Sequence, residues 1–308
     1  MRLSGRCTWI ELASSINAAR RRLLAWVGRK LNAARCVSSG VPYLTDMASR
    51  TPKLIYDVGL HDGEDTAYYL KLGFSVVAIE ANTALAQAAT RRFALEIASG
   101  QLEIVNVGIS ARSGVARFWV CDDHSEWSSF HREIASRSGC AHHAIEIPTL
   151  PFDAVLEEHG VPYYCKIDIE GNDYLCLEAM QPKLCPSYVS VELSRSPRTD
   201  PLGILHDVGY RRFKILDQTR FCSVEPKIQQ LLHARAPLGP LSRRINSVMR
   251  SRSSHDGWRF SPGSSGAIGP ATPGRWFDAR SIRDVWNWVQ EHQQTMGLSE
   301  WFDLHAAL

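Results

Sequence analysis

The sequence lacks the features of several protein classes. It has no run of about eighteen apolar residues, so no segment is expected to span a membrane. Its eight cysteines are scattered, without a C-x-x-C pair or a tight His/Cys cluster, which argues against a disulfide framework and against a zinc site. Cysteines scattered in this way are typical of free thiols in a reducing compartment, so we expect a cytoplasmic protein. Low-complexity tracts are also missing.

Positive charge is concentrated at the start of the chain. Residues 1–45 carry eight basic side chains and one acidic one, a net charge of +7, whereas the whole chain carries +3. The remainder is therefore at about −4 (3 minus 7), which argues against nucleic acid as a partner. In the arm of residues 1–46, apolar residues recur at helical spacing between arginines. Three interpretations stay open: a disordered appendage, a start codon assigned too early before Met47, or a basic amphipathic helix in weak contact with a membrane surface.

From residue 53 onwards, short apolar runs alternate with helical patterns. The expected strands are 54–59, 75–80, 102–110, 163–171, 188–193 and 211–216. The expected helices are 65–73, 82–99, 172–180 and 200–208, and residues 144–160 should give a strand and a helix. An alternating strand at 114–121 has antiparallel character, and 122–143 reads as a loop or short helix. Strands alternating with helices of this length indicate an α/β fold, with a parallel sheet covered by helices on both faces.

After residue 217 this alternation stops. A segment rich in Gly, Ser and Pro, residues 254–276, is typical of a loop, and a helical pattern follows at 281–294. Aromatic residues within the loop favour a packed segment that covers the substrate. The sequence therefore predicts three parts: a basic arm (1–46), a core (47–217) and a C-terminal extension (218–308).

The turn after the first expected strand, in the stretch IYDVGLHDGEDT, is suited to a ligand. Gly59 and Gly63 allow the backbone to turn sharply and a ligand to approach closely. The helix that begins near Glu64 offers free N–H groups to a carboxylate or phosphate. In open α/β sheets, ligands bind beyond the carboxyl ends of the strands, and this turn lies there. Glu80 ends the second strand, where a carboxylate can accept hydrogen bonds from ribose hydroxyls. An adenosine-containing cofactor is therefore the natural candidate.

The same turn argues against a dinucleotide. Its spacing is G-x-x-x-G, whereas a dinucleotide fold needs G-x-G-x-x-G. A pyrophosphate would also be repelled by the carboxylates of Asp57, Asp62, Glu64 and Asp65. A cofactor with a cationic centre and an ammonium group would not be. S-adenosylmethionine has both, together with a carboxylate for the helix N-terminus and a ribose for Glu80.

Three stretches of the sequence resemble one known family. YDVGLHDGEDTAYYLKLGFSVVAIEAN, YCKIDIEGND and YVSVEL are similar to the FkbM family of S-adenosylmethionine-dependent methyltransferases, over residues 53–216. The most specific match is KIDIEG (166–171), which resembles the K-[IV]-D-[IV]-E-G block of the family. Many members have D-V-G-A-N-x-G where this chain has DVGLHDG, so the local contacts to the methionine part of the cofactor stay open.

The resemblance implies a fold and an activity. The fold would be that of the class I methyltransferases, a Rossmann-like α/β fold with a seven-stranded, mostly parallel sheet whose last strand is antiparallel. The activity would be O-methylation of a hydroxyl on a sugar, a glycan or a small natural product. Two alternatives are a degenerate methyltransferase fold that serves as a binding module and a nicotinamide-dependent oxidoreductase.

Candidate site residues follow from these motifs. The expected cofactor-binding residues are Asp57, Gly59, His61, Gly63, Asp65, Thr66, Glu80, Asn82 and Asp168. Methyl transfer to a hydroxyl relies on positioning and on a general base. The catalytic candidates at strand ends are Asp168, Glu170 and Glu192. Asp168 has a structural alternative, as a helix cap or as the partner of Lys166. No metal is expected. The acceptor would be a small molecule or a carbohydrate, selected by residues 122–143 and 254–276. Two interpretations stay open for Trp127 and Ser129, contact with the acceptor and packing within the protein.

Overall fold

The computed structural model describes residues 51–193, 199–225, 254–296 and 301–308. The chain divides into two compact units, Met1–Met47 and Ala48–Leu308, and all the described residues belong to the second. The basic arm lies outside the described residues, so the expectations about it stay predictions. Within the described part, no helix combines the length and the apolar character needed to cross a membrane.

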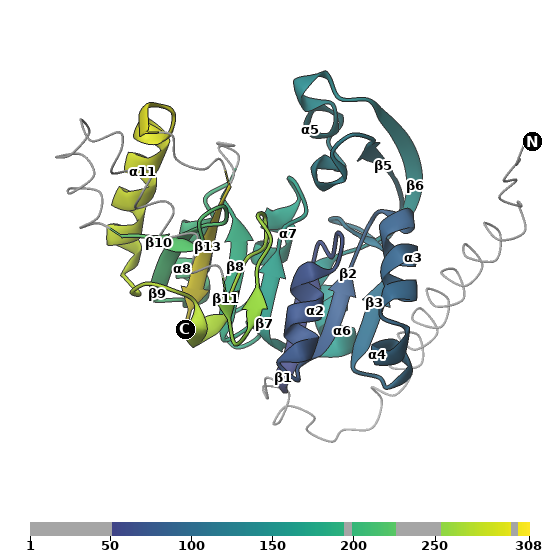
Figure 1. Ribbon diagram of the computed structural model, residues 1–308, viewed down its shortest axis with the longest axis horizontal. Helices are drawn as coiled ribbons and strands as arrows, with labels where there is room; N and C mark the ends of the chain where they lie inside the picture. Colours follow the sequence, from purple (N-terminus) through teal and green to yellow (C-terminus); the bar gives the residue numbers. More distant parts are fainter. Residues whose placement is uncertain (1–50, 194–198, 226–253, 297–300) are drawn as a thin grey trace, which may run out of the picture. The chain divides into compact units, whose positions relative to one another are not determined.

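An eight-stranded sheet forms the centre of this unit (Figure 1). In spatial order its strands are β10 (Cys222–Val224), β9 (Arg212–Asp217), β13 (Phe302–Ala307), β8 (Tyr188–Glu192), β7 (Pro162–Ile167), β1 (Thr51–Val58), β2 (Ser75–Ile79) and β3 (Leu102–Val105). Strand β13 is antiparallel to both β8 and β9, and β10 is antiparallel to β9, while β1, β2, β3, β7 and β8 pair in parallel. The expected directions, including the antiparallel last strand, are confirmed, and the short edge strand β10 is an addition.

Helices cover both faces of the sheet, as expected. One face packs against α6 (Phe152–His159), α7 (Asp173–Glu178), α8 (Pro201–Val208) and α11 (Ala279–Met296). The other face packs against α2 (Glu64–Lys71), α3 (Thr83–Arg92) and residues of the 258–268 segment. Because β1 is buried on both faces, Tyr56 and Val58 join the first cluster and Ile55 the second. This double burial explains why the strand reads as a continuous apolar run.

Two elements differ from the expectation at their ends. The long helix expected at 82–99 is divided into α3 and α4 (Ala94–Ala98), because Phe93 between them leaves the helical conformation (φ −106°, ψ 31°) and is buried. The strand expected at 102–110 is divided into β3 and β4 (Gly108–Ile109), and β4 belongs to a second sheet. The sequence pattern did not show the end of α3 or the end of β3, because the spacing of apolar residues continues through both points.

The second sheet has three strands in the order β4-β6-β5, formed by β5 (Gly114–Cys121) and β6 (His142–Leu150) beside β4. Strands β5 and β6 are antiparallel, which confirms the character expected for 114–121. The excursion between them contains η1 (Ser125–Trp127), α5 (Arg132–Ala135) and η2 (Arg137–Gly139). This is the segment expected as a loop or short helix, and it projects beyond the carboxyl ends of the central strands (Figure 1).

The described residues after 217 agree with the expectation in part. The loop region contains a short hairpin, β11 (Ser254–His255) with β12 (Trp258–Arg259), and η3 (Gly269–Ala271). Helix α11 covers the expected 281–294. Strand β13 then lies inside the central sheet, between β8 and β9. The three-part division of the chain stays a prediction, but part of the expected extension is a central strand of the core sheet.

Candidate active site

A cavity of about 330 Å³ lies at the carboxyl ends of β1, β2, β7 and β8. Its volume is in the range of small-molecule and cofactor sites. Strand β13 runs antiparallel to its neighbours, so it begins at the edge of the sheet where they end. Trp301, directly before β13, therefore lines the cavity beside Gln218, whose backbone N–H donates to the Trp301 carbonyl at 3.2 Å. The cavity is at the edge where the sequence predicted ligand binding.

The first turn has the conformation that its glycines predict. Gly59 and Gly63 both have positive φ, 94° and 80°. A Cβ on Gly59 would collide with the carbonyl oxygen of Asp168, and a Cβ on Gly63 would lie 2.7 Å from the Phe93 ring. Gly59 lines the cavity, whereas Gly63 does not. The bare backbone thus serves the packing of the protein itself, in addition to any approach of a ligand.

Glu80 is the centre of the hydrogen bonds around this turn. Its two carboxylate oxygens accept the backbone N–H groups of His61 at 2.8 Å and of Asn82 at 2.7 Å. Burial raises the pKa of Glu80, and the carboxylate lines the cavity. Each carboxylate oxygen has a second lone pair, which leaves Glu80 able to accept from a ribose hydroxyl. His61 has φ 50° and its Nε2 lies 2.8 Å from the Ser125 hydroxyl oxygen, which joins the turn to η1.

A buried lysine occupies the acidic side of the turn. The Lys166 ammonium, on a residue that is 5% exposed, donates to the Gly59 carbonyl at 3.0 Å and to Asp57 at 3.3 Å. Asp57 is fully buried and also accepts the Thr66 hydroxyl at 2.6 Å. Asp65 lies 3.8 Å from Lys166. The carboxylates that the sequence placed against a cofactor are therefore partly neutralised by the protein itself.

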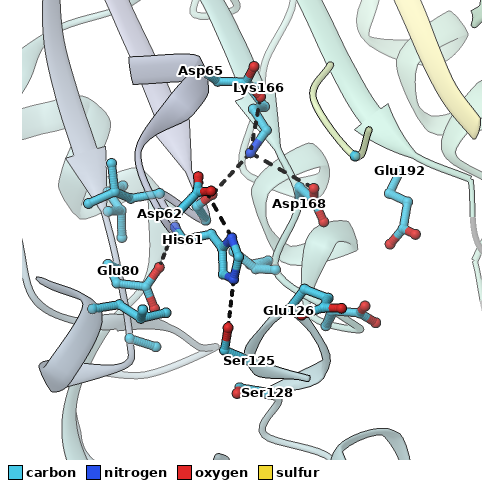
Figure 2. A pocket seen from close by; sticks show the side chains of 18 of the residues that line it. His61, Asp62, Asp65, Glu80, Ser125, Glu126, Ser128, Lys166, Asp168 and Glu192 are labelled. Atoms are coloured by element: carbon cyan, nitrogen blue, oxygen red, sulfur yellow. Dashed lines mark hydrogen bonds and ion pairs between the residues drawn. The ribbon is translucent and has the colours of Figure 1, made fainter. Parts of the chain in front are cut away.

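The three catalytic candidates all line the cavity, and Figure 2 shows Asp168 and Glu192 on the side of it away from Glu80. Asp168 lies 3.8 Å from the Lys166 ammonium. Glu170 has φ 51° and accepts a hydrogen bond from Arg137 at 2.5 Å, and burial raises its pKa to about 7. Burial raises the pKa of Glu192 well above its usual range, and the charges of Asp168 and Glu170 add to this effect. Within the described residues, no hydrogen bond to the Glu192 carboxylate is present.

The cavity is lined by many more acidic than basic side chains. Eight carboxylates line it, namely Asp62, Glu64, Asp65, Glu80, Glu126, Asp168, Glu170 and Glu192. Lys166 is the one lysine or arginine among the described lining residues. A cationic ligand is favoured in such a field and a pyrophosphate is not. The residues present therefore fit S-adenosylmethionine. That Glu80 binds its ribose and that the turn from Gly59 to His61 binds its methionine part stay predictions.

Several expected cofactor residues support the cavity without lining it: Asp57, Gly63, Thr66 and Asn82. The first three hold or shape the turn, and Asn82 caps α3 by accepting from the Ala84 N–H at 3.0 Å. Their direct contact with the cofactor stays a prediction. The lining residues Gly59, His61, Asp65, Glu80 and Asp168 are brought together as expected. Among the described residues, no three His, Cys, Asp or Glu side chains are arranged to hold a metal ion.

Other lining residues escaped the sequence reasoning. Ser125, Glu126 and Ser128 join Trp127 from the excursion after β5, while Ser129 is buried and donates to the Glu170 carbonyl at 2.6 Å. A Ser-Pro-Gly-Ser stretch, residues 261–264, also lines the cavity. Its turn signal is visible in the sequence, but no sequence pattern shows which distant helix the turn contacts.

This fold and this cavity define a class I S-adenosylmethionine-dependent methyltransferase. The family described as "Methyltransferase FkbM domain" matches residues 57–212, about half of the chain. The chain belongs to this family, and S-adenosylmethionine is its cofactor. The matched residues include the first turn, Glu80 and the three catalytic candidates.

Solved structures of methyltransferases are more distantly similar. A TehB-like S-adenosylmethionine-dependent methyltransferase from Corynebacterium glutamicum has 13% identity and a TM-score of 0.31, covering 67% of this chain and 88% of that one. A putative sarcosine dimethylglycine methyltransferase from Galdieria sulphuraria has 8% identity and a TM-score of 0.36, covering 95% and 87%. A methyltransferase from Thiobacillus denitrificans, in complex with S-adenosylhomocysteine, has 11% identity and a TM-score of 0.28, covering 85% and 86%. At such low identities and TM-scores, these likenesses carry no conclusion about the chain. No curated protein sequence matches it.

Proposed function

We propose that the chain methylates a hydroxyl group of a sugar, a glycan or a small natural product, with Glu192 as the general base. The observation that supports this proposal is that Asp168, Glu170 and Glu192 all line the cavity, with Asp168 and Glu192 on the side away from Glu80 (Figure 2). An alcohol loses its proton as it attacks, and a carboxylate with a raised pKa accepts that proton more readily than an ordinary carboxylate does.

Glu192 suits this role better than its two neighbours. Glu170 is held by Arg137 at 2.5 Å, so its carboxylate is already engaged. Asp168 shares the Lys166 ammonium with Asp57 and Asp65. By contrast, Figure 2 shows Glu192 to the side of Asp168 that is away from Lys166, with no dashed contact to the residues drawn. Its burial favours the protonated form, so an ionised Glu192 gains from taking up the acceptor proton.

The reaction then follows from the positions of these groups. S-adenosylmethionine supplies the methyl group. The acceptor oxygen forms a bond to the methyl carbon as the carbon–sulfur bond breaks, and the hydroxyl proton passes to Glu192. Asp168 and Lys166 fix the wall against which the methionine part rests, while Trp301, 40% exposed at the mouth, offers a flat apolar face to a ring-shaped acceptor.

The test is an assay with S-adenosylmethionine labelled in its methyl group, the full-length protein and a panel of saccharides and natural-product alcohols. We expect label in an acid-stable ether. Glu192→Gln should lower kcat about 10²- to 10⁴-fold without changing the Kd of S-adenosylhomocysteine, whereas the exposed control Glu178→Gln should leave both unchanged. Because only the ionised carboxylate accepts a proton, kcat should rise as the pH increases through the raised pKa of Glu192. Label in an amine, a carboxylate ester or a carbon–methyl bond would contradict the proposal.

The setting of this reaction is part of the same proposal. A cytoplasmic location agrees with the free thiols of all six cysteines in the described ranges. The acceptor would be a small molecule or a carbohydrate rather than nucleic acid. Cell fractionation with an antibody against the chain would test the location.

A further inference from the structure

A turn from outside the family-matched residues forms one wall of the cofactor cavity. Ser261, Pro262, Gly263 and Ser264 all line the cavity, although the family match ends at residue 212. The Ser264 N–H donates to the Ser261 carbonyl at 3.1 Å, and Gly263 has φ 93°. Proline at the second position and a glycine with positive φ at the third are the requirements of a type II turn. The local sequence thus dictates the shape of this wall.

The turn holds the first turn of helix α2. The Ser264 hydroxyl donates to one carboxylate oxygen of Asp65, and the Ser265 N–H donates to the other at 3.2 Å. The Gly266 N–H in turn donates to the Ser264 oxygen at 3.0 Å. Asp65 is 7% exposed and lies 3.8 Å from the Lys166 ammonium. Both oxygens of this buried carboxylate are therefore oriented by residues about 200 positions away in the chain.

The segment on the N-terminal side of the turn is fixed to α2. The Tyr68 hydroxyl lies 2.7 Å from His255 Nδ1, and the Tyr68 ring packs edge-on against Phe260 at 4.9 Å between centroids. The Lys71 ammonium donates to the Asp256 carbonyl at 2.8 Å. These contacts place the hairpin that precedes the turn along the helix that begins at the cofactor site.

The segment on the C-terminal side is fixed by a second lysine. The Lys214 ammonium donates to the carbonyls of Thr272 at 2.8 Å and Gly274 at 3.0 Å, and lies 4.1 Å from the centre of the Trp276 ring. Lys214 comes from β9 of the central sheet. The turn is thus held on both sides by the core, which makes it a built wall and not a loose loop.

We propose that the Ser261–Ser264 turn is a positioning element for S-adenosylmethionine: it closes the methionine end of the cavity and holds Asp65 against Lys166. Lys166 donates to the Gly59 carbonyl, so the turn acts on the cofactor loop through Asp65 and Lys166. The inference concerns the cofactor end, and it holds whichever acceptor is methylated.

Two matched glycine substitutions test this proposal. Gly263→Ala and Gly73→Ala each force a side chain into a positive φ, 93° and 82°, and at both positions the new Cβ meets no atom within 4 Å. The strain is therefore alike, but Gly73 lies after the far end of α2, away from the cavity. Both full-length variants should show similar reductions in Tm. Only Gly263→Ala should weaken S-adenosylhomocysteine binding. We expect a loss of about tenfold, because a distorted turn would break the hydrogen bond from Ser264 to the carboxylate of Asp65.

A second pair of variants follows the contact itself. Ser264→Ala removes the hydroxyl that donates to Asp65 and should weaken S-adenosylhomocysteine binding about tenfold, whereas Ser264→Thr keeps a hydroxyl and should restore most of the affinity. If Ser264 acts through Asp65, the double variant Ser264→Ala, Asp65→Asn should bind no more weakly than Asp65→Asn alone. A purely structural role would lower Tm without this pattern in the Kd values.

Isothermal titration calorimetry separates the outcomes. Wild-type affinity in Gly263→Ala or in Ser264→Ala would overturn the proposal, and so would an equal loss of affinity in Gly73→Ala. If Gly263→Ala does not fold, the Ser264 pair decides. A wild-type chain that failed to bind S-adenosylhomocysteine would overturn this inference together with the cofactor, while an amine as acceptor would overturn the proposed function alone.

Discussion

The replacement Glu80→Gln is a direct test of how the cofactor site is built. Glu80 accepts two backbone N–H groups, from His61 at 2.8 Å and from Asn82 at 2.7 Å, and faces the cavity with its remaining lone pairs. A carboxamide has one oxygen, so it can keep one of these hydrogen bonds. Its amino group would then oppose the second backbone N–H, which leaves that donor buried without a partner.

We expect Glu80→Gln to change two quantities, the free energy of unfolding and the Kd of the ligand. Loss of one hydrogen bond to a charged group should lower the free energy of unfolding of the ligand-free protein by about 1.5–3 kcal/mol. Weaker hydrogen bonds to the ribose should cost a further 1–3 kcal/mol in binding, roughly a 5- to 150-fold increase in Kd. The second effect is separate from the first, because binding is measured on molecules that are already folded.

Urea unfolding and calorimetric titration with S-adenosylhomocysteine measure these two quantities on the same protein. The exposed Glu178→Gln serves as the control and should change neither. If Glu80→Gln lost stability but kept the wild-type Kd, Glu80 would be a brace for the turn and not the ribose acceptor. If both quantities were unchanged, the assignment of these hydrogen bonds would be wrong.

Two further variants address stability. Gly59→Ala places a Cβ against the Asp168 carbonyl at a φ of 94°, and urea unfolding should show a loss of about 2–5 kcal/mol; a loss below 1 kcal/mol (roughly the cost of a tolerated glycine change) would show that this turn relaxes easily. Burial raises the pKa of Asp303 from 3.8 to about 7, so its contribution to stability is present below its ordinary pKa and is lost as the pH rises through about 7. Asp303→Asn should remove this dependence, on the order of 4 kcal/mol at about 1.4 kcal/mol per pKa unit; an unchanged difference between urea unfolding at low and at neutral pH would refute it.

Much of the fold could be predicted because its signals are local. The strands β1, β2, β7 and β8 are buried on both faces, so each appears as a short apolar run with a carboxylate at or next to its end. The parallel direction of most strands followed from the alternation of strands and helices, whereas the antiparallel last strand was implied by the family resemblance. Strand β13 was missed since its residues, Phe302–Ala307, include a buried aspartate and a buried histidine, Asp303 and His305. Because these polar residues interrupt the apolar run, the sequence does not show the pattern of a central strand.

The site could be predicted only in part, for a similar reason. Gly59, Glu80 and Asp168 lie at strand ends and carry their signal within a few residues. The contacts of these residues with distant parts of the chain carry no such local signal. Lys166 was expected only as a partner of Asp168, whereas in the structure it also contacts Asp57 and the Gly59 carbonyl in the first turn. The contact of the Ser261–Ser264 turn with α2 joins residues about 200 apart, and a single sequence contains no signal for such a pairing.

The position of β13 has a consequence for how the protein folds. Residues Phe302–Ala307 form ladders with β8 on one side and β9 on the other, so these two strands have no partner in that gap until β13 inserts. The sheet is completed through pairings between residues that are far apart in the chain, and such topologies fold slowly. Until β13 inserts, the unpaired edges of β8 and β9 are sites at which another chain can pair, so slow insertion of this strand favours aggregation.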